Sequence, residues 1–292
     1  MRKIINFLLS TECACDMPQE LINKYNLQIA PMLFYINGQE FRSDDKNFSS
    51  EQVCKFMREG ASTKTTQINE NDAKEYLEEL LKQGKDILHF SFSSAMSNTY
   101  NNFKKVAEEL NATNENKIYV IDTLCQSGGV GLLIKLTADE IISKDLSITD
   151  AINFVESIKL NIAHIFTVDD LKYLKRGGRI STSSAVLGTI LKIKPILRLS
   201  KEGVIVPAQK VISRKKAIAT LAEKTVEYYS NKFDTIFITH ADCEDEAKAL
   251  ADMVEEKLGV TPYIMSLSAL VTNHSGPGTM AIYFHAKSRE FE

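Results

Sequence analysis

The chain has 292 residues, 44% of them hydrophobic and 25% charged, which is ordinary globular composition and enough for one large domain or two of typical size. The formal net charge is −3, so no basic excess points to nucleic acid or an anionic membrane surface as the main partner. The apolar stretch at residues 4–9 is too short for a membrane span or a secretory signal core, and Glu12 precedes Cys13 where a lipoprotein signal needs a small residue. We therefore expect a cytoplasmic protein without a transmembrane segment.

The five cysteines are odd in number and mostly scattered, which favours reduced thiols over a disulfide framework. Cys13 and Cys15 are separated by one residue, but no second cysteine pair or spaced histidine pair accompanies them. The sequence therefore predicts no metal site.

Segments of strand length alternate with helical patterns in the first half of the chain. Asn37-Gly38 predicts a hairpin turn, and Ser49 with Gln52 forms a capping box at the start of a helix. This order of elements predicts a parallel α/β sheet flanked by helices. Strands are expected at 3–9, 27–36, 87–91 and 118–121, and helices at 49–58, 71–82, 99–110 and 127–142.

The pattern changes after a helix expected at 149–160. Hairpin-like strand pairs now mix with helices, which is typical of an α+β domain. We therefore expect two domains, a parallel-sheet α/β domain at 1–160 and an α+β domain at 161–292. The second half is expected to hold strands at 164–168, 196–200, 204–212, 235–240, 263–267 and 280–285, and helices ending at 175, starting after Arg179, and at 214–229 and 246–258.

Two hydroxyl-rich clusters, at 62–67 and 91–99, lie where a strand gives way to a helix. Ligands of open α/β sheets bind at that edge, and hydroxyls with free amides at a helix start can hold a carboxylate or a phosphate. Helix capping is the simpler explanation of the first cluster taken alone, and the pair is more informative than either member. The glycines at 128–131 lack the spacing of a dinucleotide-binding loop, and we interpret them as close-packing positions.

Two further clusters, at 175–180 and 274–278, combine charged or imidazole side chains with glycines. The first contains Arg176-Gly-Gly-Arg179, which is either a functional loop or a solvated helix end. The second places His274 before a rigid Gly-Pro-Gly turn, where the histidine is either structural or functional. A Gly-x-Ser-x-Gly elbow is absent from the sequence, so a Ser/His/Asp hydrolase has weak support.

Taken together, these clusters resemble the DegV family of bacterial fatty-acid-binding proteins over nearly the whole chain. The departures concern residues 12–18, which read ECACDMP where the family usually has DSTADLP, and Ile68 and Asn98, which replace a proline and a glycine. The matching segments are YLKRGGRIS at 173–181, LKIKP at 191–195, HSGPG at 274–278, TTQ at 65–67, SSAMSNTY at 93–100 and ID at 121–122.

The resemblance implies a DegV-like fold with a lipid tunnel between the two domains, holding one long-chain fatty acid. Its carboxylate is then expected near Thr65, Thr66, Ser93 or Ser94, and His274. Some members of the family present the acid to a separate ATP-dependent kinase subunit, which makes an acyl phosphate. The chain has no nucleotide motif of its own, which fits a fatty acid kinase subunit without catalytic residues and without a cofactor.

We assign Arg179 to docking of the kinase partner or to handling of the phosphoryl group, because a guanidinium binds carboxylate or phosphate at two points. The alternative is an ion pair with Asp169 or Asp170 that ties down the loop. Apolar side chains that either line the tunnel or belong to the core are Val186, Leu187, Ile190 and Leu191.

Two other functions remain open from the sequence. The chain is a hydrolase or phosphotransferase if His274 acts with a nearby serine, and a lipid sensor if the bound acid changes its contacts with other proteins. The lipid carrier is the preferred interpretation.

Overall fold

The computed structural model describes residues 5–45, 48–180 and 193–290. Its first half is a four-stranded parallel sheet in the order β2-β1-β6-β7. The strands are β1 (Leu8–Glu12), β2 (Gln28–Ala30), β6 (Ile87–Ser91) and β7 (Ile118–Asp122). The helices of this part are α1 (Gln19–Tyr25), α3 (Glu70–Leu81), α4 (Thr99–Asn111), α5 (Gly128–Lys144) and α6 (Ile148–Ile158).

The second half forms a six-stranded mixed sheet in the order β10-β9-β8-β13-β11-β12, in which β11 and β12 pair in parallel and the other neighbours pair antiparallel. Alternate residues of its strands enter two different cores, so both faces are buried. The strands are β8 (Ile162–Thr167), β9 (Ile193–Leu199), β10 (Ile205–Ile212), β11 (Ile236–His240), β12 (Tyr263–Ser266) and β13 (Met280–His285).

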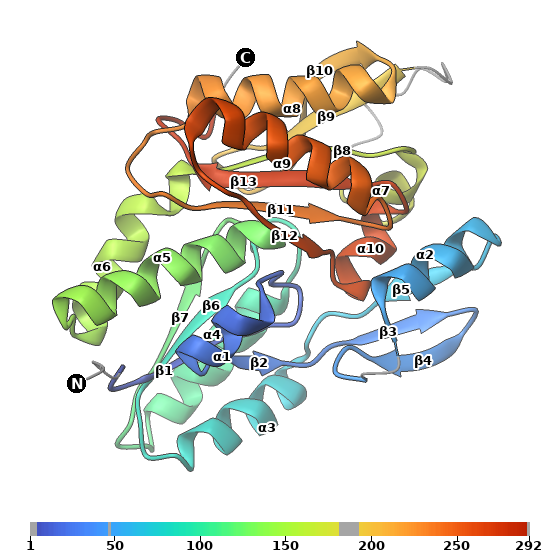
Figure 1. The fold of residues 1–292 in the computed structure, drawn as a ribbon. Helices are drawn as coiled ribbons and strands as arrows, with labels where there is room; N and C mark the ends of the chain where they lie inside the picture. Colours follow the sequence, from blue (N-terminus) through green and yellow to red (C-terminus); the bar gives the residue numbers. More distant parts are fainter. Residues whose placement is uncertain (1–4, 46–47, 181–192, 291–292) are drawn as a thin grey trace.

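Helices α8 (Arg214–Tyr228) and α9 (Glu244–Leu258) cover one face of this sheet. Helix α5 packs on the other face, against β8, β11 and β13, and also contacts β6 of the parallel sheet. Figure 1 shows α5 lying between the two sheets. The larger core therefore runs from one sheet to the other through this helix.

A small antiparallel sheet in the order β4-β3-β5 extends to one side of the molecule (Figure 1). Asn37 and Gly38 both have positive φ, 51° and 83°, as a two-residue hairpin turn between β3 and β4 requires. The strands are β3 (Leu33–Ile36), β4 (Gln39–Arg42) and β5 (Thr63–Thr65), with helices α2 (Ser50–Arg58), α7 (Lys172–Arg176) and α10 (Ala269–Ser275) close by.

The α/β class with a parallel sheet is confirmed, as are the hairpin and the capping box. Three details of the sequence prediction are wrong. The first strand lies at Leu8–Glu12, later than 3–9. The apolar segment 27–36 is two strands of different sheets, because Pro31 interrupts it. The segments α1, β5 and α10 were not anticipated, since three to seven residues are too few to show a period.

The glycines of α5 are close-packing positions, as the sequence predicts. A Cβ on Gly129 would lie 2.0 Å from His164 Nε2, and one on Gly131 would lie 2.3 Å from the Asp16 carbonyl oxygen. The helix can approach β8 and the loop after β1 only because these side chains are absent.

The division into domains at residue 160 stays a prediction. The part of the chain that the structure describes has no helix of the length and apolarity that a membrane span needs. The helix expected after Arg179 and the four tunnel candidates Val186, Leu187, Ile190 and Leu191 lie outside the described residues.

Candidate functional site: a mostly apolar cavity with a Thr/His/Arg end

A cavity is lined by the ends of β1 and β5, by the loops that follow β1, β6 and β7, and by residues of α7, α10, β8, β10 and β13. Most of its exposed lining is apolar. The apolar lining residues are Ala14, Met32, Phe92, Met96, Phe166, Leu174, Ile205, Leu267, Leu270, Val271 and Ala281. The polar ones are Glu12, Thr65, Thr66, Gln67, Ser97, Thr99, Gln126, Ser127, Arg179, His274, Ser275, Thr279 and Tyr283.

Thr65 and His274 form the best-defined polar pair of this wall. Thr65 Oγ1, at the end of β5, lies 2.7 Å from His274 Nε2, in the last turn of α10. Gly177 packs against the other side of the imidazole, where an added Cβ would lie 2.4 Å from Nδ1. Burial, together with the positive charges of Arg179 and Arg176, lowers the pKa of His274 to about 4. The imidazole is therefore neutral at pH 7 and can donate or accept a hydrogen bond.

Two arginines surround this pair. Arg179 lies in the cavity wall, donates to the Gly177 carbonyl oxygen, and has its pKa lowered by burial. Arg176 donates to Thr63 Oγ1 at 2.6 Å. Among the described residues, Asp169 pairs with Lys194 and Arg214 rather than with Arg179.

Asp170 pairs with Lys172. The described structure therefore forms no ion pair between Arg179 and either aspartate, which was the alternative role for this arginine.

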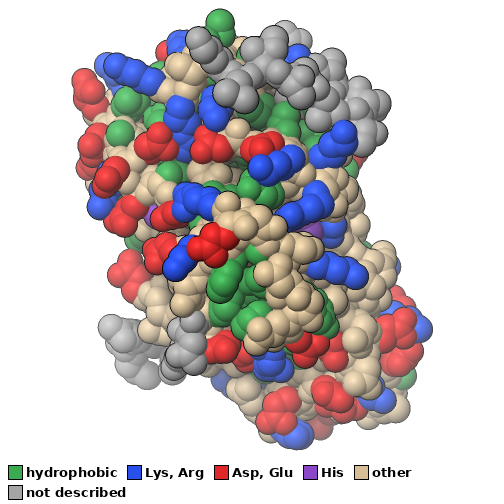
Figure 2. Space-filling view, turned by 90° about the vertical axis from the view of Figure 1, so that its right-hand side faces the viewer, with side chains coloured by type: hydrophobic (Ala, Val, Ile, Leu, Met, Phe, Trp, Pro, Cys, Tyr) green, Lys and Arg blue, Asp and Glu red, His purple; other side chains and the backbone are tan. Residues whose placement is uncertain are grey.

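Figure 2 shows Lys and Arg side chains gathered at mid-height on this side of the molecule, above a group of hydrophobic side chains. Exposed cations on the adjacent elements include Lys64, Lys172, Lys175 and Arg176.

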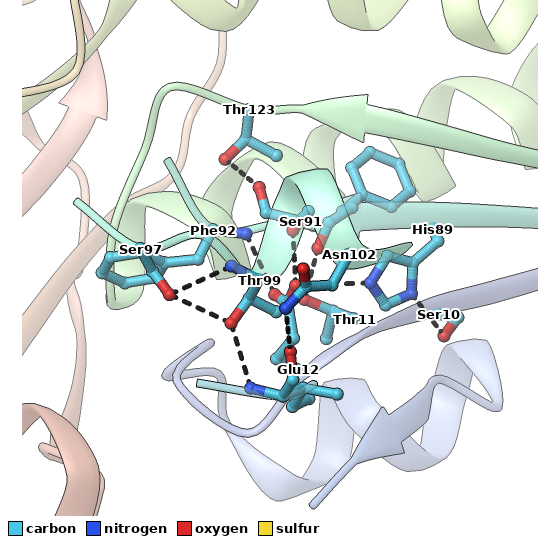
Figure 3. Close-up of polar contacts among 12 residues, drawn as sticks. Ser10, Thr11, Glu12, His89, Ser91, Phe92, Ser97, Thr99, Asn102 and Thr123 are labelled. Atoms are coloured by element: carbon cyan, nitrogen blue, oxygen red, sulfur yellow. Dashed lines mark hydrogen bonds and ion pairs between the residues drawn. The ribbon is translucent and has the colours of Figure 1, made fainter. Parts of the chain in front are cut away.

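The two hydroxyl-rich segments meet in the structure. Thr99 Oγ1 lies 3.0 Å from Ser97 Oγ and accepts from the Ile68 amide at 3.3 Å, while Asn102 donates to the Ile68 carbonyl oxygen at 2.7 Å (Figure 3). These bonds join the start of α4 to the segment that carries Thr65 and continues into α3. Ser97 and the Thr65 segment therefore lie in one wall.

Some of the predicted head-group residues lie in the cavity wall and others do not. Thr65, Thr66 and His274 line the cavity, and the Thr66 hydroxyl also donates to the Leu33 carbonyl oxygen at 3.3 Å. The described lining includes neither Ser93 nor Ser94.

Ser93 is fully buried and donates to the Gly203 carbonyl oxygen at 2.9 Å, which joins the loop after β6 to the turn between β9 and β10. The Ser94 amide donates to the Asp122 carboxylate at 3.2 Å. Ser97, three residues further on, is the serine of this loop in the wall. The sequence also held a signal for Ser97, because this residue begins the Ser-Asn-Thr segment directly before α4.

Other polar residues of the wall were missed. Ser127 donates to the Asp16 carboxylate and accepts from Tyr283 Oη at 2.8 Å, and burial raises the pKa of Asp16 to about 6. Asp16 and Ser127 lie after β1 and β7, so their strand-end positions were a usable signal. Tyr283 gave none, because it lies inside a buried strand. No group of three His, Cys, Asp or Glu that could hold a metal occurs among the described residues.

Known proteins show which family this architecture belongs to. A family model described as "Uncharacterised protein, DegV family" matches residues 6–287. A DegV domain-containing protein of Clostridium perfringens is 34% identical over 289 residues, which are 97% of this chain and 99% of the relative.

Solved structures agree in fold over nearly the full length. A DegV family protein from Thermus thermophilus, described for its fatty acid binding, is 26% identical with a TM-score of 0.84 and covers 97% of this chain and 100% of its own. A fatty acid binding DegV family protein from Streptococcus agalactiae gives the same identity, TM-score and coverage, 26%, 0.84, 97% and 100%. The chain described here is a member of the DegV family.

Proposed function

We propose that this protein binds one long-chain fatty acid in the cavity, with the carboxylate at the Thr65 and His274 end and the acyl chain along the apolar wall. Support comes from the pairing of Thr65 with a neutral His274 beside Arg179, in a wall that is otherwise mostly apolar. Hydroxyl, imidazole and guanidinium groups are the donors that a carboxylate needs. Relatives from Thermus thermophilus and Streptococcus agalactiae are described as binding fatty acids.

The acyl chain supplies most of the binding free energy. Burying about 15 methylenes at about 0.8 kcal/mol each contributes on the order of 12 kcal/mol before the costs of association. A hydrogen bond to the carboxylate adds about 1.5 to 3 kcal/mol. In this account the head-group residues Thr65, Thr66, Ser97 and His274 fix the orientation of the acid, and no cofactor takes part.

We further propose that the protein presents the acid to a separate ATP-dependent kinase subunit in the cytoplasm. Arg179 lies beside the proposed carboxylate site, where a phosphoryl group would be added. Because it lies in the cavity wall, it is placed to contact the acid as well as the incoming phosphoryl group. This widens the role expected from the sequence, which was confined to the partner and the phosphoryl group.

The hydrolase alternative has less support. A hydrolytic Ser/His pair needs an acceptor that orients the imidazole, and the group packed against His274 Nδ1 is the backbone at Gly177. The hydroxyl on Nε2 belongs to Thr65 rather than to a serine.

Mass spectrometry of lipids released from the denatured, purified protein tests the carrier function. We expect a stoichiometric fatty acid of unmodified mass, and slow or no hydrolysis of a long-chain p-nitrophenyl ester. Turnover of the ester that is lost in His274→Gln, with no acid retained by the wild type, would establish the hydrolase instead.

A further inference from the structure

Glu12 is a buried acidic residue at the end of β1, 2% exposed, that also lies in the cavity wall. Its carboxylate has three polar neighbours in β6 or directly after it. Ser91 Oγ donates to Oε1 at 2.5 Å, the Phe92 amide donates to Oε2 at 2.9 Å, and His89 Nε2 lies 3.4 Å from Oε1. The side chain therefore joins the ends of two neighbouring strands, as Figure 3 shows.

The histidine behind Glu12 is itself held in place. His89 Nδ1 lies 2.9 Å from Ser10 Oγ, which lies 2.8 Å from Tyr76 Oη. Donation from Nε2 to Glu12 leaves Nδ1 to accept from Ser10, whose oxygen accepts from Tyr76. The ring also packs on Phe103, with centroids 4.0 Å apart. This network holds the imidazole against the carboxylate.

The segment that Glu12 secures is the loop that enters the head-group site. Phe92 begins it, and Ser97 and Thr99 end it, all three in the cavity wall. Ser93, between them, is tied to the β9–β10 turn. The loop is thus anchored at its start by Glu12 and at its end by the Thr99 bond to Ile68. Movement of the first anchor would displace Ser97.

We propose that Glu12 is a positioning residue for the head-group site, acting through Ser91 and Phe92 to hold Ser97 and Thr99 in reach of the ligand carboxylate. The inference rests on the proposed binding of a fatty acid. The inference goes beyond that binding in one specific claim: Glu12 governs the preference for an acid head group over an uncharged one. A residue that only supported the cavity would affect both head groups alike.

The test compares palmitic acid with hexadecanol as competitors that displace a fluorescent fatty acid from the purified, delipidated protein. For Glu12→Ala we expect the affinity for the acid to fall about tenfold, and that for the alcohol to change less than about twofold. Glu12→Gln is expected to stay within about threefold of the wild type, because its amide oxygen accepts from Phe92 and its amide nitrogen donates to Ser91 Oγ, while His89 takes the other tautomer, with Nδ1 donating to Ser10 Oγ. Glu20→Ala, on the exposed face of α1, is the matched control and should match the wild type.

Equal losses for acid and alcohol in Glu12→Ala, or a glutamine variant as weak as the alanine variant, would overturn the proposal. If circular dichroism shows that Glu12→Ala does not fold, Ser91→Ala tests the proposal in its place. Ser91→Ala should lower the ratio of the affinity for the acid to the affinity for the alcohol about threefold. An unchanged ratio would overturn the proposal. A wild-type protein that binds neither competitor would instead contradict the proposed function itself.

Discussion

Thr65 Oγ1 and His274 Nε2 lie 2.7 Å apart although 209 residues separate them in the chain. The contact joins the small antiparallel sheet to the helix that precedes the last strand of the six-stranded sheet. Because burial keeps the imidazole neutral, the pair can turn one donor toward a carboxylate without an additional positive charge at that point. The nearby charge comes from Arg179 and Arg176.

Removing this pair should weaken binding of the acid without unfolding the protein. We expect Thr65→Val and His274→Gln each to lower palmitic acid affinity about tenfold or more, since one hydrogen bond to a charged carboxylate contributes about 1.5 to 3 kcal/mol. The double variant should lose less than the product of the single losses, because the two residues share a contact. Displacement of a fluorescent fatty acid measures all three, with Thr113→Val on the exposed surface as the control.

Two serines of one loop should behave in opposite ways. Ser97→Ala should lower affinity for the acid and leave the unfolding midpoint in urea nearly unchanged. Ser93→Ala removes the bond to Gly203 and should cost about 1 to 3 kcal/mol of stability while the acid-to-alcohol preference persists. Reversed results, with Ser93 governing the preference, would place the carboxylate in the loop position first expected from the sequence.

His274 should make the stability depend on pH. Its pKa is about 4 in the folded protein and about 6.5 unfolded, so between these values the unfolded state binds more protons and stability falls as the pH falls. Between pH 7 and pH 5 this contributes a loss of about 2 kcal/mol that His274→Gln should lack. Urea unfolding at both pH values measures it, and equal losses in the two proteins would contradict the assigned burial of the imidazole.

Gly129→Ala should be severely destabilising, by at least about 3 kcal/mol, because the new Cβ would lie 2.0 Å from His164 Nε2. Gly84→Ala makes the same chemical change at a position with φ of +67° and no atom within 4 Å of the added Cβ. It should cost only about 1 kcal/mol, from backbone strain. Comparable thermal shifts in the two variants would show that α5 is free to move away from β8.

Much of the fold could be predicted, because long helices carry their own periodicity. The helices α3, α4 and α8 lie within two residues of the expected positions. The five-residue strands β6 and β7 were also predicted, because each is a largely apolar run between two helical patterns. Short elements could not be predicted in this way. Thr63–Thr65 is a strand only because Phe34 and its neighbours in β3 pair with it, and a tertiary contact leaves no local pattern.

The candidate site was predicted at the level of loops rather than of side chains. The end of the strand before it placed the loop 91–99 at the correct edge of the parallel sheet. The sequence cannot show that Ser97 and not Ser93 lies in the cavity wall, because this depends on Gly203 packing over Ser93. His274 was identified by its turn, whereas its helix was not. At position 12 this chain has a glutamate where the family usually has an aspartate. The proposed role of Glu12 depends on its contact with Ser91, 79 residues away in the chain, so the local sequence could not show it.

The most direct measurement is the carbon NMR resonance of palmitic acid labelled with ¹³C at the carboxyl group and bound to the intact protein. We predict one saturable bound resonance at the ionised position, which still does not titrate at pH 5 because Arg179 and the donor of the Thr65–His274 pair stabilise the carboxylate. The resonance should move in Thr65→Val and stay fixed in Ser94→Ala. A bound carboxyl group that titrates like the free acid, or one that Thr65→Val leaves unchanged, would contradict the account.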